Sequence, residues 1–197
     1  MGFIDDAPET TGQRVLSLPV LGGFDYLRRE AEQEDEVAIA LGIGDNRARE
    51  RVAQRCRSAN ILFVTAIHPA AVVSRSARIG SGTVIMAGAV VNANATIGDS
   101  VIVNTGAIIE HDCVLGDYSH ISPNAAMGGC SRLGPVSWLG IGAVMIHGVS
   151  VGSGTIVGAG AVVIRDIPND VIAVGVPARI SGSSRQPPDS EPDDRTF

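Results

Sequence analysis

The chain has 197 residues, and 45% of them are apolar, so it can form one or two small domains with a real core. Aromatic residues make up only 4%, so aliphatic residues must build that core, and a net charge of −6 argues against nucleic acid as the main partner. Three cysteines without metal-type spacing indicate reduced thiols in a cytoplasmic protein. We find neither a signal-peptide pattern nor an apolar run of about 18 residues, so nothing suggests export or membrane insertion.

Residues 1–67 predict part of a small α/β domain. "GFIDD" and "VAIALGIG" have the pattern of short buried strands, and "NILFVTAIHP" predicts another strand that ends at Pro69. "DNRARERVAQRCRS" predicts a helix with Asp45 as its N-cap and a charged face. The order strand, loop, strand, helix, strand favours a parallel sheet of the Rossmann-like type. Because the chain opens on a strand with no Gly-rich loop before it, we expect a truncated nucleotide-binding fold.

From residue 73 to residue 163, every sixth residue is aliphatic or methionine. At 45% apolar residues, sixteen such matches in a row would arise by chance roughly 3 times in a million. Four residues after each of these positions but the last, from Ala77 to Ala161, the residue is small: Ala, Thr, Val, Cys or Ser. Gly often follows the repeat position directly. The repeat positions are Val73, Ile79, Ile85, Val91, Ile97, Val103, Ile109, Leu115, Ile121, Met127, Leu133, Leu139, Met145, Val151, Val157 and Val163.

A period of six fits a solenoid in which each repeat is one short strand and a turn, and three repeats make a triangular coil of 18 residues. The repeat residue fills the interior, the small residue fits the corner, and Gly serves where a turn needs unusual backbone angles. The pattern resembles the hexapeptide-repeat left-handed β-helix. We therefore predict a mainly β protein: a partial Rossmann-like α/β domain at 1–67, a left-handed parallel β-helix with a closing segment at 68–180, and a disordered tail at 181–197.

Several motifs resemble, in order, those of the PglD/NeuD family of sugar acetyltransferases. They are "GFIDD", "LPVLGGFDYL", "GIGDNRAR", "IHPAAVVS", "VNTGAIIEHDCVLGDYSHISPNA" and "AVGVPARI", and they span about residues 1–180. The resemblance implies transfer of acetyl from acetyl-CoA to a sugar, most often a nucleotide-linked 4-amino-4,6-dideoxy sugar used for glycan or polysaccharide biosynthesis. The family opens with a strand and a Gly-rich loop before "FIDD", and we expect these to be lacking here.

His111 is the main catalytic candidate. By position alone it would be a solvated surface histidine, whereas the resemblance implies that it is the general base. Asp112 would orient the imidazole and increase its basicity, with Glu110 as the rival for that role. Gly129 lies 18 residues later, so it should stack directly over His111 and leave a backbone N–H near the ring.

The resemblance also implies residues that bind the two substrates. Acetyl-CoA would contact His120, Gly129 and Ile141, with the Gly129 N–H near the thioester oxygen. The sugar nucleotide would contact Asp5, Asp6, Gly44 and Asn104. For most of these residues a plain structural role, as a surface or turn residue, is the alternative.

These features predict direct acetyl transfer without a covalent enzyme intermediate and without a metal. Such β-helices usually form homotrimers with the active site between neighbours. One alternative is a sugar O-acetyltransferase of the sialic-acid type, and another is a non-catalytic β-helix scaffold. A zinc hydratase is disfavoured because His111, His120 and His147 are spaced 9 and 27 residues apart.

Overall fold

The computed structural model describes residues 1–34 and 36–185, which divide into two compact units. The first unit contains Met1–Ile39 and Val52–Phe63, and the second contains Ala40–Arg51 and the chain from Val64 onward. Among the described residues, no helix is both long and apolar enough to cross a membrane.

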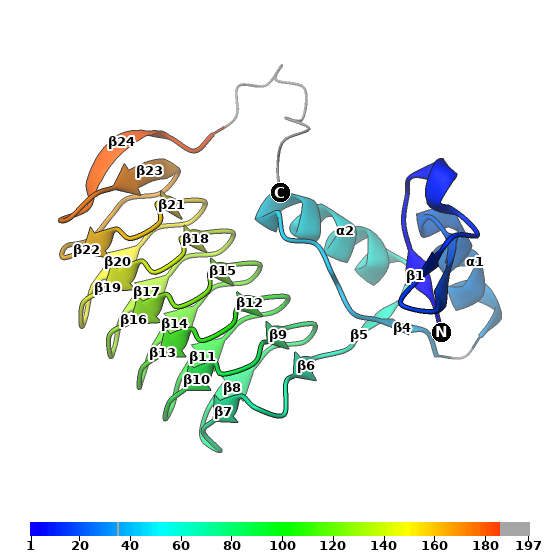
Figure 1. Ribbon diagram of the computed structural model, residues 1–197, viewed down its shortest axis with the longest axis horizontal. Helices are drawn as coiled ribbons and strands as arrows, with labels where there is room; N and C mark the ends of the chain where they lie inside the picture. The colour runs from blue at the N-terminus through cyan, green and yellow to red at the C-terminus, as the bar shows by residue number, and fades with distance from the viewer. Residues whose placement is uncertain (35, 186–197) are drawn as a thin grey trace. The chain divides into compact units, whose positions relative to one another are not determined.

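The first unit contains two small sheets and two helices (Figure 1). Strands β1 (Phe3–Ile4), β3 (Leu18–Gly22) and β2 (Arg14–Val15) form one sheet in the order β1-β3-β2, and a 3-10 helix (Pro8–Thr10) lies between β1 and β2 in the chain. Strand β4 (Ala38–Ile39) pairs in parallel with β5 (Leu62–Phe63). The helices are α1 (Phe24–Gln33) and α2 (Asn46–Ser58), whose first residues belong to the second unit.

Helix α1 corrects the expectation of a loop between the first two strands. Phe24, Leu27 and Ala31 follow a helical spacing, and Leu27 is buried in the core of the unit with Cys56 and Ile61. This short apolar stripe was obscured by the many charged residues around it. The predicted N-cap of α2 is confirmed, since the Ala48 N–H donates to a carboxylate oxygen of Asp45 at 2.6 Å.

The second unit is built from short strands stacked as coils (Figure 1). Each strand from β6 to β22 has two residues, and the second of them occupies the repeat position. The strands are β6 (Ala66–Ile67), β7 (Val72–Val73), β8 (Arg78–Ile79), β9 (Val84–Ile85), β10 (Val90–Val91), β11 (Thr96–Ile97), β12 (Ile102–Val103), β13 (Ile108–Ile109), β14 (Val114–Leu115), β15 (His120–Ile121), β16 (Ala126–Met127), β17 (Arg132–Leu133), β18 (Trp138–Leu139), β19 (Val144–Met145), β20 (Ser150–Val151), β21 (Ile156–Val157) and β22 (Val162–Val163).

Three sheets form the three faces of this left-handed β-helix, and their strand pairs are parallel except for β23 (Val171–Val174) with β24 (Arg179–Ser183). Their orders are β22-β19-β16-β13-β10-β7, then β20-β17-β14-β11-β8, and finally β24-β23-β21-β18-β15-β12-β9-β6. Paired residues are 18 apart, as with Val91 and Ile109, so the predicted coil length is confirmed. The stack begins at β6, one repeat earlier than predicted, because Ile67 is in phase with Val73.

The interior of the coils is aliphatic throughout. Every repeat residue from Ile85 to Val163 is at most 2% exposed, and the small residues four positions later are almost as buried. Burying one such aliphatic side chain contributes roughly 1.5–3 kcal/mol. The interior ladder therefore holds each coil to the next, and the turns at the corners are free to carry other residues.

Glycine is needed directly after the repeat position for a different reason from the one expected. These glycines do not have positive φ; instead, a Cβ on Gly80 would lie only 2.3 Å from the Gly98 carbonyl oxygen of the next coil. Positive φ occurs three residues after the repeat position, at every sixth residue from Gly82 to Gly160, with values from 52° to 73°. Asp112 and Cys130 occupy this turn position.

The β-helix is closed by β23 (Val171–Val174) and β24 (Arg179–Ser183). Strand β23 runs parallel to β21 and antiparallel to β24. Residues 181–183, which we expected to begin a disordered tail, therefore belong to a strand. The rest of that predicted tail from residue 186 lies outside the described residues.

Candidate active site

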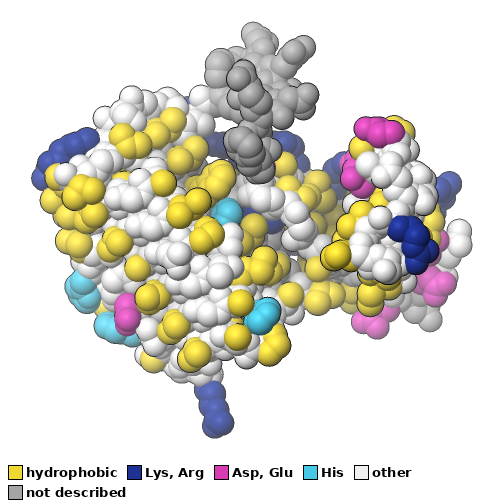
Figure 2. All heavy atoms as spheres, viewed as in Figure 1, with side chains coloured by type: hydrophobic (Ala, Val, Ile, Leu, Met, Phe, Trp, Pro, Cys, Tyr) yellow, Lys and Arg dark blue, Asp and Glu magenta, His cyan; other side chains and the backbone are white. Residues whose placement is uncertain are grey.

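His111 and Asp112 form a hydrogen-bonded pair in the turn after β13. The Nδ1 atom of His111 lies 2.8 Å from Oδ2 of Asp112, and both side chains are about half exposed. Asp112 has φ of 58°, a left-handed conformation that Asp tolerates better than most residues. Glu110 accepts a hydrogen bond from the His111 backbone N–H and does not partner the ring. Figure 2 shows histidine side chains beside an acidic one on the surface of the coils.

Gly129 stacks on His111, as its 18-residue spacing predicted. A Cβ on Gly129 would lie 2.6 Å from Nε2 of His111, so the imidazole fills the space that a side chain would need. The Cys130 N–H donates to the His111 carbonyl at 2.9 Å and fixes the two coils at this point. The Gly129 N–H donates no hydrogen bond to any described residue. One coil further, the His147 ring centroid lies 6.4 Å from that of His111.

Asn94 holds Asp112 from the other side. It lies 18 residues before Asp112, and its Nδ2 atom donates to Oδ1 of Asp112 at 3.3 Å. The hydrogen bond from His111, and then that from Asn94, lower the pKa of the Asp112 carboxyl. The sequence analysis missed Asn94, although subtracting one coil length from Asp112 would have identified it. A cavity of 290 Å³ adjoins the pair and is lined by Ser76, Arg78, Asn94, Thr96 and Asp112.

His120 lies in a different, buried cluster on β15. Its ring is 7% exposed and stacks on Trp138, with centroids 5.1 Å apart and ring planes at 12°. The Nε2 atom lies 3.2 Å from Nδ2 of Asn104, while Oδ1 of Asn104 accepts from the Thr105 N–H. The Nδ1 atom of His120 is buried and makes no hydrogen bond of ordinary geometry with a described residue. Asn104 therefore orients His120 in this chain.

Arg49 joins the segment Ala40–Arg51 to the coils beside His120. Its guanidinium is 1% exposed and donates to backbone carbonyls of both parts, and Asn46 donates to two more. Burial, and then the charge of Arg49, lower the pKa of His120 to about 4, while the backbone of Gly44 acts in the opposite direction. The acceptors of Arg49 are Ser100 O, Ile43 O, Gly44 O, Tyr118 O, Ser119 O and Oδ1 of Asn46.

The structure places the other predicted substrate contacts as follows. Ile141 is 60% exposed in the turn after β18. Gly44 is exposed and belongs to the second unit. Asp5 and Asp6 follow β1 in the first unit, where Asp5 accepts from the Ala7 N–H.

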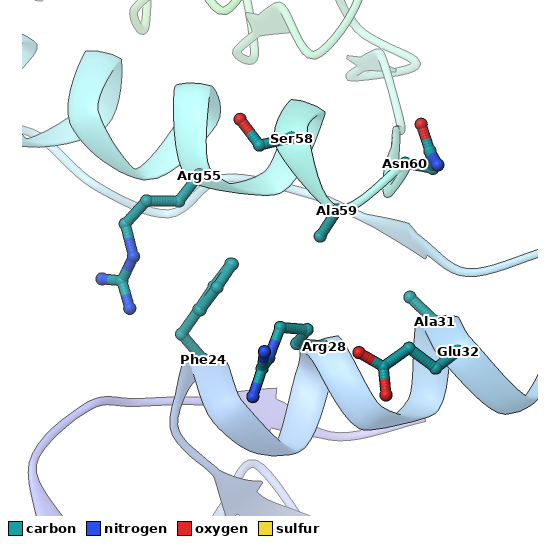
Figure 3. Close-up of a pocket in the computed structure, with 8 residues that line it drawn as sticks. All are labelled: Phe24, Arg28, Ala31, Glu32, Arg55, Ser58, Ala59 and Asn60. Atoms are coloured by element: carbon teal, nitrogen blue, oxygen red, sulfur yellow. The ribbon is translucent and has the colours of Figure 1, made fainter.

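Asp6 is already engaged within the first unit. It accepts from the Phe24 N–H at 2.7 Å and pairs with Arg55 at 3.2 Å, and the Phe24 bond is the main reason that its pKa is lowered. The Arg55 guanidinium lies over the Phe24 ring, 4.1 Å from its centroid. Figure 3 shows Phe24 and Arg55 at a cavity of 690 Å³ between α1 and α2, lined by Phe24, Arg28, Ala31, Glu32, Arg55, Ser58, Ala59 and Asn60.

Two family models match separate parts of the chain. Residues 1–56 match the family model of the PglD N-terminal domain, and residues 94–129 match that of the bacterial transferase hexapeptide repeat. A search of curated proteins gave no significant match.

Solved structures cover most of the chain. Perosamine N-acetyltransferase from Caulobacter crescentus, crystallised with CoA and GDP-perosamine, is 43% identical over 92% of this chain and 85% of its own, with a TM-score of 0.87. The acetyltransferase domain of PglB from Neisseria gonorrhoeae FA1090 is 40% identical over 91% and 86%, with a TM-score of 0.85. WeeI from Acinetobacter baumannii AYE is 29% identical over 91% and 85%, with a TM-score of 0.83. With this identity along nearly its whole length, the chain belongs to the PglD/NeuD-type sugar acetyltransferases.

Proposed function

We propose that this protein transfers the acetyl group of acetyl-CoA to the amino group of a nucleotide-linked amino sugar, of the 4-amino-4,6-dideoxy class, for glycan or polysaccharide biosynthesis. The relative from Caulobacter crescentus is a perosamine N-acetyltransferase and binds CoA and GDP-perosamine, which supports this substrate class. The observation in this chain that carries the proposal is the exposed His111–Asp112 pair.

In the proposed reaction, His111 is the general base. Its Nδ1–H donates to Asp112, so the lone pair of Nε2 is free to take a proton from the sugar amine. The amine nitrogen attacks the thioester carbon, the C–N bond forms, the C–S bond breaks, and CoA leaves as a thiolate that is then protonated. The N–H of Gly129, which has no acceptor among the described residues, would donate to the oxyanion that develops on the thioester oxygen.

The remaining substrate contacts are also part of the proposal. His120 and Ile141 would contact acetyl-CoA, Asn104 the sugar, and Asp5, Asp6 and Gly44 the nucleotide. The burial of His120 leaves only a small part of the residue for contact with acetyl-CoA, and its Nδ1 atom is itself buried. The hydrogen bonds of Asp6 to Phe24 and Arg55 would have to exchange or be shared when a nucleotide binds.

A homotrimer fits the surface of the β-helix. Repeat residues point inward, so the residue before each one points outward. In the sheet from β7 to β22 all of these outward residues are aliphatic, and several are more than a third exposed, which favours burial against a second copy. They are Val72, Val90, Ile108, Ala126, Val144 and Val162. A cytoplasmic location completes the proposal and agrees with three free cysteines.

The test is release of CoA from acetyl-CoA in the presence of GDP-perosamine, with the corresponding sugar nucleotide that has a hydroxyl at the same carbon as the matched control. We expect release with the amine only, and a product whose acetyl group resists hydroxylamine as an amide does. A hydroxylamine-sensitive product would instead indicate O-acetylation. Absence of CoA release with every amino-sugar nucleotide tested would favour a non-catalytic scaffold.

A further inference from the structure

We propose that His111, Asp112 and Cys130 form a binding site for a zinc ion, and that zinc bound there inhibits the protein. The metal is not a cofactor in this proposal. Binding stands on the geometry alone, whereas inhibition rests on the proposed function of His111 as the base.

The coil geometry brings the three side chains together. Asp112 and Cys130 are 18 residues apart and occupy the same turn position in adjacent coils, with φ of 58° and 60°. The backbone bond from Cys130 to His111 ties these turns to each other, and Gly129 contributes no side chain between them. One ligand atom from each of the three residues lies within 4.8 Å of the other two, the one such group found among residues 1–34 and 36–185.

The donor set suits zinc. A thiolate, an imidazole and a carboxylate bind Zn²⁺ at about 2.3, 2.0–2.1 and 2.0–2.2 Å, and water can supply the fourth ligand. Two such nitrogen and oxygen ligands lie roughly 3.4 Å apart around a tetrahedral ion. The Nδ1 and Oδ2 atoms are now 2.8 Å apart, so zinc can replace the proton between them if two half-exposed side chains open slightly. Rotation of the exposed Cys130 side chain brings in the sulfur.

The inhibition follows from the change in which nitrogen of His111 carries a proton. When zinc takes Nδ1, the imidazole proton moves to Nε2, and the thiol of Cys130 releases its proton to solvent as it binds the ion. The Nε2 atom then has no free lone pair and cannot accept a proton from the sugar amine. Zinc thus blocks the base with only small movements of its three ligand side chains.

The thiol makes the site easy to detect. Cys130 is exposed, whereas Cys56 and Cys113 are buried, so a cobalt–thiolate signal from the folded chain reports on Cys130. The probe is Co²⁺ added to the metal-free full chain, with Zn²⁺ as the competitor. We expect a near-ultraviolet charge-transfer band that zinc abolishes, that is absent from Cys130→Ser, and that persists in Cys113→Ala, where Ala is the residue that other corners carry.

Activity is measured separately. Zinc should stop acetyl transfer by the wild-type protein, while Cys130→Ser keeps its uninhibited rate and needs at least about tenfold more zinc, or about 1.4 kcal/mol. Cys130→Ala and circular dichroism check that the effect is not misfolding.

The outcomes separate the two proposals. A band without any acetyl transfer would leave the metal site standing and overturn the proposed function. Acetyl transfer that zinc does not affect, with no cobalt band, would overturn the metal site, as would equal zinc sensitivity of the wild type and Cys130→Ser.

Discussion

His111 and His120 lie nine residues apart in the same β-helix, yet their surroundings are opposite. His111 is in a turn, half exposed, and bonded to a carboxylate. His120 is on a strand, 7% exposed, stacked on Trp138 and covered by the segment that Arg49 holds. The repeat therefore determines the backbone position of each residue in the coil. The burial and the charges around its side chain depend on which other residues pack next to it.

The sharpest test of this contrast is His111→Ala. If the exposed histidine is the base, kcat should fall by about 10²–10⁴-fold, while the affinity for acetyl-CoA barely changes. Steady-state kinetics with acetyl-CoA and the amino-sugar nucleotide measure both quantities. Near-normal turnover would remove His111 from the mechanism.

The second test weakens the contacts that hold the segment Ala40–Arg51 beside His120. Arg49→Met keeps the apolar stem but leaves several buried carbonyls without a donor, which should lower the free energy of unfolding by about 3–5 kcal/mol. Arg47→Met is the matched control, because Arg47 is exposed and makes only a surface ion pair worth less than about 1 kcal/mol. Urea denaturation compares them, and equal losses would show that the buried network is not what holds the segment.

Much of this contrast was inaccessible from the sequence. The coil stack follows from the period of six, because an interior of fixed width accepts only aliphatic side chains at the repeat position. The 18-residue spacing also predicts that Gly129 stacks on His111. The burial of Arg49 could not be predicted, since an arginine on a charged helix usually faces solvent, and its acceptors are carbonyls up to 70 residues away. Helix α1 was missed because its apolar stripe is only three residues.

The buried histidine should also make stability depend on pH. The pKa of His120 is about 4 in the folded protein and about 6.5 when unfolded, so the unfolded chain binds more protons between these values. Stability from this group is complete above pH 6.5 and is lost as pH falls toward 4, by about 3 kcal/mol in total. Urea midpoints for the wild type and His120→Gln from pH 7 to pH 4 test this, because the variant should lack that part of the acid dependence. Parallel curves would contradict the burial of a neutral ring.

The smallest expected effect concerns Asn94. This residue holds Asp112, and so it tests whether the exposed His111 is oriented by its neighbours. Asn94→Ala removes the second hydrogen bond of Asp112, so the carboxylate gains freedom and orients the imidazole less well. One hydrogen bond of about 0.5–1.5 kcal/mol predicts a loss in kcat of about 2- to 10-fold, with an unchanged KM for acetyl-CoA.

Asn124→Ala is the matched control, because Asn124 occupies the same turn position with φ of 57° and is exposed. Both variants should therefore cost similar stability from backbone strain, whereas only Asn94→Ala should slow the reaction. If both slow it equally, the effect comes from the coil backbone and Asn94 does not orient Asp112. A double-mutant cycle with Asp112→Asn separates these cases further, since the Asn94 substitution should have no additional effect on kcat once the carboxylate is gone.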